Sequence, residues 1–275
     1  MRLEHAVIAA DAFTPPRPFR AFAVRSDEPA LAWEARAPYA RVHRVRADLL
    51  GDAARSALVD AGYPRVDIAE TFAVDYAPTT WPELAALADA ALPARLAAAL
   101  LATGVLGDDP ADYDRCGATR VDFLASRGAG FHNDVGRHWS RCLFWILALD
   151  VADVEFVAPH AGVRLPVAVG DLLVFDPTMA HGLCRPRDHG RALPDSFDDG
   201  DAARQLFLTG EIEIPVARWA ALGSPWLPVE AHAERGALDL MVAEFDDRTG
   251  AVKRPGTLRE SLSRAVCHAE PEPPR

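Results

Sequence analysis

The stretch Gly170–Pro186, GDLLVFDPTMAHGLCRP, decides how the middle of this chain folds. It begins with a Gly-Asp turn signal, continues with the apolar run Leu172–Phe175, and turns again at Asp-Pro-Thr. His181 then opens another short apolar run. The stretch therefore predicts two short strands joined by a turn, with a histidine at the start of the second strand.

Similar short runs rich in Val, Leu, Ile and Phe surround this stretch, and Gly, Pro and Asp separate them. The runs occupy residues 119–125, 141–150, 153–159, 163–169, 171–176, 181–186 and 204–214. Closely spaced strands without intervening helices favour an all-β sandwich or barrel over alternating βαβ units. The acidic segment 194–203 interrupts the series and is either a solvated surface loop or a lid.

Helical signals precede and follow the strand series. Residues 48–62 carry apolar side chains at helical spacing, and Thr80 with Glu83 forms a capping box that starts a second helix. Pro93 is expected to break or kink that helix, and a second capping box predicts a helix over 257–266. The predicted fold class is therefore mainly β with flanking helices.

Composition limits the class of protein. The chain has 275 residues, half of them hydrophobic, with a formal net charge of −11 and one lysine, Lys253. This balance argues against a nucleic-acid partner. The four cysteines are widely spaced and are expected to be reduced thiols. The sequence lacks a convincing signal peptide and any apolar stretch of about 18 residues, so a cytoplasmic protein without membrane contact is expected.

The segment Gly128–Trp139, GAGFHNDVGRHW, carries the residues that favour a metal site. On a strand, His132 and Asp134 would point to the same side and form a pair of ligands for a divalent metal. Two histidines compete for the third position. His138 would give a compact spacing loosely similar to hydrolytic zinc motifs. His181 lies 47 residues after Asp134 and would give the two-His, one-carboxylate set of non-haem iron enzymes.

Taken together, GFHND, RCLFWILALD, VAVGDLLVFDPTMAHGLCRP and ARQLFLTGEI resemble the Fe(II)/2-oxoglutarate-dependent dioxygenases, especially their prolyl-hydroxylase-like branch. The resemblance covers residues 119–214, about a third of the chain. It implies a double-stranded β-helix, also called a jelly roll or cupin-like fold. It also implies that Fe(II) is bound by His132, Asp134 and His181. Retention of the aspartate argues against halogenation, because the family's halogenases replace it with a small residue.

The family also needs a basic residue for the distal carboxylate of 2-oxoglutarate, which a guanidinium can hold bidentately. Arg204 is favoured because it begins the last core strand, while Arg191 and Arg185 are alternatives in nearby segments. Ala148 stands near the position of the family's tyrosine partner for this carboxylate, so another group must assist. The remaining expected site residues are Ile146 and Leu183 beside the cosubstrate, and Arg120, Asp122 and Arg141 beside the substrate.

The resemblance implies one oxygenase domain over 1–275, with a mostly helical region at 1–115, a jelly-roll core at 116–215, and a helical extension with a disordered tail at 216–275. The expected activity is hydroxylation or desaturation of an unactivated C–H bond, with release of succinate and CO2. The arginines favour a small acidic or amino-acid-like substrate. Two other hypotheses remain: a cupin-like dioxygenase or isomerase that needs no 2-oxoglutarate, and a catalytically silent β-barrel binding module.

Overall fold

The apolar run in the middle of the chain forms β8 (Cys142–Asp150), the central strand of a seven-stranded sheet in this computed structural model. Trp145 and Leu147 pack on one side of the sheet and Ile146 and Ala148 on the other, so burial on both faces explains a run without alternation. The structure describes residues 3–9, 22–24, 34–36, 39–66, 74–107, 121–126, 129–132, 134, 141–158, 163–179, 181–184, 205–228, 243–245 and 252–255.

Neighbouring strands are antiparallel throughout the sheets. The large sheet has the order β1 (Leu3–Ala9), β4 (Arg41–Ala47), β11 (Asp171–Phe175), β8, β13 (Gln205–Glu213), β6 (Val121–Ser126) and β5 (Val74–Thr79). A four-stranded sheet has the order β10 (Val163–Val167), β9 (Val154–Ala158), β12 (His181–Cys184) and β7 (Ala129–His132). Smaller sheets join β14 (Trp226–Pro228), β3 (Glu34–Arg36) and β2 (Phe22–Val24), and β15 (Ala243–Phe245) with β16 (Val252–Pro255).

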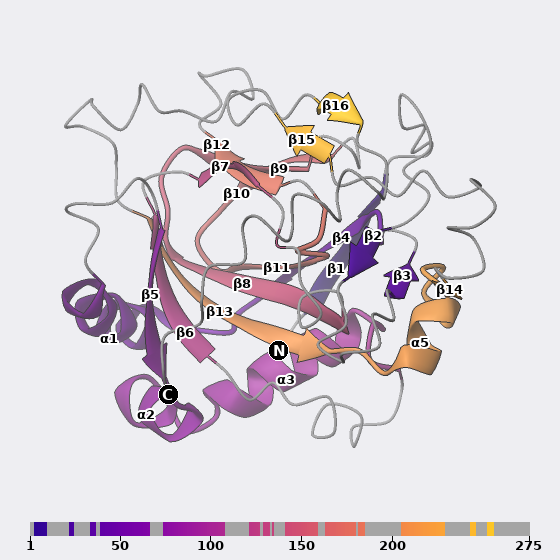
Figure 1. Cartoon of the computed structure of the whole chain (residues 1–275). Coiled ribbons are helices and arrows are strands. Elements are labelled where there is room, and N and C mark those ends of the chain that lie inside the picture. The colour runs from indigo at the N-terminus through magenta and orange to yellow at the C-terminus, as the bar shows by residue number, and fades with distance from the viewer. Residues whose placement is uncertain are drawn as a thin grey trace, which may run out of the picture.

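The four-stranded sheet lies over one face of the seven-stranded sheet (Figure 1). Side chains from both sheets meet in one apolar cluster, which includes Leu124, Ile146 and Phe207 from the large sheet and Phe156 and Leu183 from the small one. Two antiparallel sheets packed over a shared core confirm the predicted jelly-roll class. The functional site described below lies in this layer.

The opposite face of the large sheet is covered by α1 (Asp52–Gly62), α2 (Trp81–Leu87) and α3 (Leu92–Ala102), as Figure 1 shows. Leu58, Leu84 and Leu96 from these helices are fully buried against side chains such as Trp145 and Phe123. Among the described residues no single helix is long and apolar enough to cross a membrane, although α2 and α3 pass that test as a pair bent by 116°.

The local helix signals are confirmed. The Thr80 hydroxyl accepts from the Glu83 backbone N–H, and the Glu83 side chain accepts from the Thr80 backbone N–H, so the capping box forms as predicted. Pro93 lies in the first turn of α3, where its missing N–H costs nothing, and α2 ends before it. Gly62 ends α1 so close to the sheet that a Cβ there would stand 2.7 Å from the Phe123 ring.

The region 1–115 differs from the expected mostly helical segment, because β1, β4 and β5 extend the large sheet at its two edges. In β4, Val42 and Val45 pack on opposite faces, and the polar residues His43 and Arg44 between them hide the strand period. In β5, Pro78 weakens the strand signal, but an edge strand tolerates proline. After residue 215, α5 (Val216–Ala221) is followed by short strands. The predicted helix at 257–266 and the tail lie outside the described residues.

A buried histidine network lies at the β1–β4 edge. The His43 ring is 3% exposed, and its Nδ1 lies 3.0 Å from Nε2 of His5. Burial raises the pKa of Tyr39 to about 12, so the phenol keeps its proton, and its hydroxyl is hydrogen-bonded to His43 Nε2. Burial, followed by the nearby His5 and Arg41, lowers the pKa of His43 to about 4. His43 is therefore held neutral in the folded chain.

We expect this neutral histidine to make the fold sensitive to mild acid. The unfolded chain binds a proton at His43 near pH 6.5, whereas the folded chain resists it until about pH 4. The contribution of neutral His43 to the free energy of unfolding is therefore complete above pH 6.5. It falls by roughly 3 kcal/mol as the pH drops towards 4. Urea unfolding at pH 7 and pH 4 should show that His43→Gln loses less unfolding free energy between the two pH values than the wild type does. An equal loss in the variant and the wild type would contradict this origin.

Candidate metal centre and its pocket

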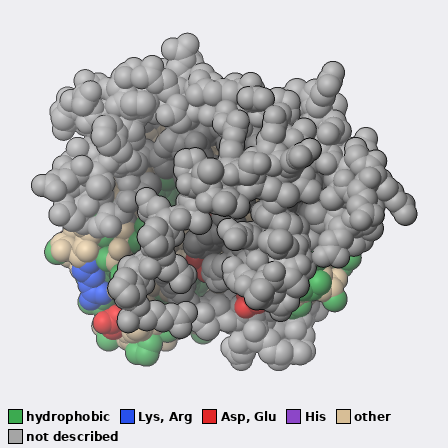
Figure 2. Space-filling model, in the orientation of Figure 1, with side chains coloured by type: hydrophobic (Ala, Val, Ile, Leu, Met, Phe, Trp, Pro, Cys, Tyr) green, Lys and Arg blue, Asp and Glu red, His purple; other side chains and the backbone are tan. Residues whose placement is uncertain are grey.

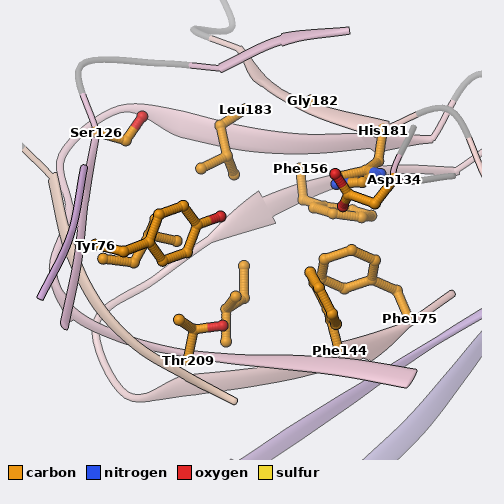
Figure 3. A pocket seen from close by; sticks show the side chains of 12 residues that line it. Tyr76, Ser126, Asp134, Phe144, Phe156, Phe175, His181, Gly182, Leu183 and Thr209 are labelled. Atoms are coloured by element: carbon orange, nitrogen blue, oxygen red, sulfur yellow. The ribbon is translucent and has the colours of Figure 1, made fainter. Parts of the chain in front are cut away.

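Asp134 and His181 line one pocket between the two sheets. Figure 3 shows them at the same end of it, with Ser126, Tyr76 and Leu183 towards the other end. The full lining is Tyr76, Leu124, Ser126, Asp134, Phe144, Ile146, Phe156, Phe175, His181, Gly182, Leu183 and Thr209. A carboxylate and an imidazole thus face a mostly apolar space, where a bound cation would be shielded from water.

The His181 ring is fixed by one hydrogen bond and two aromatic neighbours. Its Nδ1 lies 2.8 Å from the carbonyl oxygen of Met179, and a carbonyl can only accept, so Nδ1 carries the proton. Phe175 and Phe156 pack on the ring with centroid separations of 4.9 and 6.1 Å. The lone pair is therefore on Nε2, the arrangement in which backbone carbonyls orient metal-binding histidines.

The same turn also anchors Asp134. The backbone N–H of Asp134 donates to the carbonyl oxygen of Pro177 at 2.9 Å, two residues before the Met179 carbonyl that holds His181. Residues 176–179 therefore fix both ligand candidates through main-chain oxygens. Neither of these two bonds uses the Asp134 carboxylate or His181 Nε2.

A buried ion pair fixes this turn in its place. Arg36 Nη1 and Nη2 bind Asp176 Oδ2 and Oδ1 at 2.6 and 2.8 Å, and both side chains have no exposed surface. The same carboxylate accepts from the Thr178 hydroxyl at 2.6 Å and from the Tyr39 backbone N–H at 3.0 Å. The Arg36 guanidinium also stacks on Trp219, with Cζ 3.9 Å from the ring centroid. Charge, hydrogen bonds and stacking together hold residues 176–179 rigid.

Sequence reasoning missed Arg36, because it is 140 residues from Asp176 in the chain and stands in no motif. The available signal was the Asp-Pro-Thr turn itself. An aspartate that begins such a turn is expected to bond its own backbone two residues on, and the Thr178 N–H does donate to Asp176 Oδ1 at 3.0 Å.

The backbone places His132 beside this pair. In the β7–β12 ladder, His132 is the register partner of His181, so the two residues stand directly opposite each other. The His132 side chain is not among those described. Within the part of the chain whose side chains the structure describes, no three His, Cys, Asp or Glu residues form a metal-binding group.

Other predicted site residues fall in different places. Ile146 and Leu183 line the pocket, as expected for residues beside a cosubstrate. Asp122 is 4% exposed and lines an adjoining cavity, while Arg141 lines neither cavity. Lying outside the described residues are His138, Arg120, Arg185, Arg191, Arg204 and the segment 194–203.

Three hydroxyl-bearing residues line the pocket without having been predicted. Ser126 is fully buried and is the register partner of Gln205, the first residue of β13. Thr209 lies further along β13, and its hydroxyl donates to the Trp145 carbonyl at 2.9 Å. Tyr76 comes from β5, the strand whose pattern proline obscured. The buried Ala148 leaves the tyrosine position of the resemblance without a hydroxyl, and these three groups are near enough to the pocket to serve instead.

No protein-family model and no curated protein sequence matches the chain. Solved structures do show similarity. One is HygX from Streptomyces hygroscopicus with nickel and 2-oxoglutarate bound, which is 14% identical with a TM-score of 0.36, over 63% of this chain and 82% of that one. Another is the collagen prolyl hydroxylase of Paramecium Bursaria Chlorella virus-1, 12% identical with a TM-score of 0.39, over 63% and 90%.

A third is a 2OG-Fe(II) oxygenase family oxidoreductase from Burkholderia pseudomallei, 14% identical with a TM-score of 0.39, over 62% of this chain and 84% of that one. The chain resembles 2-oxoglutarate–Fe(II) oxygenases. TM-scores below 0.4 are too low to assign an activity, so any assignment must come from the chain's own site.

Proposed function

We propose that this chain is an Fe(II)/2-oxoglutarate-dependent oxygenase that hydroxylates or desaturates an unactivated C–H bond of a small molecule, releasing succinate and CO2. One observation carries the proposal: a single braced turn fixes Asp134 and His181 at one end of an enclosed pocket, with His132 opposite His181 in the ladder. Two imidazoles and one carboxylate are the ligand set that suits non-haem Fe(II).

The donor set of the chain fits the metal. Asp134 supplies a hard oxygen ligand and His181 a neutral imidazole with its Nε2 lone pair towards the pocket. His132 is the third ligand in this proposal. When bound, Fe(II) together with 2-oxoglutarate and dioxygen would supply the oxidising power for C–H cleavage. The chain's own part is to orient these groups and to keep water away, which Phe144, Phe156 and Phe175 do around the ligand pair.

The far end of the pocket suits the distal carboxylate of 2-oxoglutarate. Ser126 and Tyr76 lie there, away from Asp134 and His181 (Figure 3). Ser126 pairs with Gln205, and Arg204 directly precedes Gln205 in the chain. We retain Arg204 as the proposed carboxylate clamp, ahead of Arg191, because it directly precedes the rigid strand β13, with a pocket hydroxyl as its partner. A guanidinium at this end would hold a five-carbon diacid with its keto acid group towards the metal.

The proposal is tested by Fe(II) binding and by succinate formation from 2-oxoglutarate. Purified chain should bind one Fe(II) and consume 2-oxoglutarate slowly even without a primary substrate. In His181→Ala, Fe(II) affinity and the rate of succinate formation should each fall by roughly 100-fold or more, because the change removes a proposed ligand. Cys184→Ala, on the same strand and also buried but outside the pocket lining, is the matched control and should keep both.

Other outcomes point to the rival hypotheses. Stoichiometric iron binding without 2-oxoglutarate binding or turnover would favour the cupin-like enzyme. Absence of iron binding after anaerobic reconstitution would favour the silent binding module. Full activity in His181→Ala would contradict the metal site itself.

A further inference from the structure

A second cavity adjoins the first pocket at Asp134. It is lined by Tyr76, Asp122, Asp134, Phe144, Thr209, Gly210 and Glu211, so it shares four of its lining residues with the first pocket. The shared residues are Tyr76, Asp134, Phe144 and Thr209. Because Asp134 belongs to both spaces, a molecule in the second cavity would lie beside the proposed iron ligand. This is where a substrate C–H bond must be presented.

The charged residues in the described lining of this cavity are all acidic. Its described lining residues carry three carboxylates, those of Asp122, Asp134 and Glu211, and no lysine or arginine. Asp134 is assigned to the metal, which leaves Asp122 and Glu211 to face a substrate. Figure 2 shows the face of the molecule hollowed near its centre, with hydrophobic and acidic side chains visible inside the hollow. An anionic molecule would be repelled from such a wall.

Strand register places the two carboxylates within reach of one ligand. Asp122 on β6 is the register partner of Thr209 on β13, and Glu211 follows Thr209 by two residues on the same face. Such diagonal neighbours have their Cα atoms about 7–8 Å apart. A single ammonium group between Asp122 and Glu211 could donate charge-assisted hydrogen bonds to both carboxylates.

Two aromatic rings border the same space. Tyr76 lies on β5, which pairs with β6. Phe144 lies on β8 and is the register partner of Glu211 on β13. The Tyr76 side chain is 47% exposed, so its ring is accessible to a ligand. Aromatic faces attract cations electrostatically, and carboxylates combined with rings are the usual surroundings of a bound ammonium. The cavity therefore offers two kinds of attraction to a cation.

The thiol of Cys142 lies near the same acidic residues of β13. Burial raises the pKa of Cys142 to about 12, and the negative charges of Glu211 and Glu213 act in the same direction. Cys142 is the register partner of Glu213 at the start of β8.

We propose that the substrate is a small molecule bearing a protonated amine, which Asp122 and Glu211 bind and the rings of Tyr76 and Phe144 flank. This inference rests on the proposed oxygenase function and names the substrate class of that site. Arginines near the pocket favoured an acidic or amino-acid-like substrate in the sequence; this inference departs from the acidic alternative and is compatible with the amino-acid-like one.

The test uses L-lysine, putrescine, spermidine and tyramine, each paired with its N-acetylated form. At least one free amine should raise succinate formation above the rate without substrate by about 5-fold or more, and its acetylated partner should not. Glu211→Gln and Asp122→Asn should each weaken the response to that amine by roughly 10-fold in apparent affinity. Glu213→Gln, an exposed position on the same strand outside the cavity, is the matched control and should respond like the wild type.

Three results would overturn the inference: no response to any free amine, an equal response to the acetylated forms, or an unchanged response in both cavity variants. Calorimetric titration of the same amines into the metal-free chain separates this failure from failure of the proposed function. Amine binding that depends on Glu211, in a chain without 2-oxoglutarate turnover, would leave the cation site standing and reject the oxygenase. Turnover of 2-oxoglutarate without any selectivity for free amines would keep the oxygenase proposal and reject the cation site.

Discussion

Replacing Asp134 with alanine should abolish Fe(II) binding and succinate formation while leaving the fold intact. The carboxylate faces the pocket, whereas the contact that holds this residue in place is its backbone N–H on the Pro177 carbonyl. Alanine keeps that backbone bond and removes the ligand oxygen. We expect activity to fall by at least about 1,000-fold, since loss of a ligand exceeds the 10–100-fold typical of residues behind it.

Iron content after anaerobic reconstitution, succinate yield and the thermal unfolding midpoint together measure this effect. Asp60→Ala on the exposed side of α1 is the matched control, because it removes an aspartate on the helical layer and should change none of the three. Iron-dependent succinate formation at wild-type rates in a folded Asp134→Ala chain would exclude Asp134 as a ligand.

Replacing Arg36 with methionine should destabilise the chain by about 3–5 kcal/mol, because Asp176 would remain as a buried charge without its partner. The same change should weaken Fe(II) binding in the folded fraction by roughly 10–100-fold, because Asp176 holds the turn that anchors Asp134 and His181. Urea unfolding gives the first quantity, and Fe(II) titration below the unfolding transition gives the second.

Further variants separate positioning from general stability. Adding Asp176→Asn to the methionine variant removes the stranded charge and keeps one of the two acceptor oxygens, which can serve either the Thr178 or the Tyr39 N–H, so part of the stability should return. Arg164→Met breaks the exposed pair with Glu155 and should cost less than about 1 kcal/mol without affecting iron. Unchanged iron affinity in the Arg36 variant would show that the turn does not depend on the ion pair.

Local signals in the sequence predicted elements whose burial pattern is simple. The runs that became β8, β11 and β13 are buried on both faces, and the capping box at Thr80 is a contact between near neighbours. Strands β1, β4 and β5 were missed because edge positions and mixed burial leave no clean period in their residues. Their place in the sheet depends on pairing with β11 and β6, which no local pattern encodes.

The site divides in the same way. His181 and its turn could be predicted because a histidine at a strand start, after an Asp-Pro-Thr turn, is a local pattern. The Arg36–Asp176 pair could not, because 140 residues separate its members. Glu211 could not be chosen either. The register of β13 with β6 and β8 decides which residues of 204–214 face the interior. That register includes an irregularity between Leu206 and Phe207.

The bracing of residues 176–179 means that the jelly-roll core is not a transplantable module. Arg36 comes from β3, whose partner strand β14 lies past residue 215, and the same guanidinium bonds Ser224 and stacks on Trp219. Segments from both sides of the core therefore converge behind the ligand pair. A graft of the strands alone would carry Asp134 and His181 but not the contacts that position them, so substitutions in these outer segments could change the affinity of the proposed metal site without any change in its ligands.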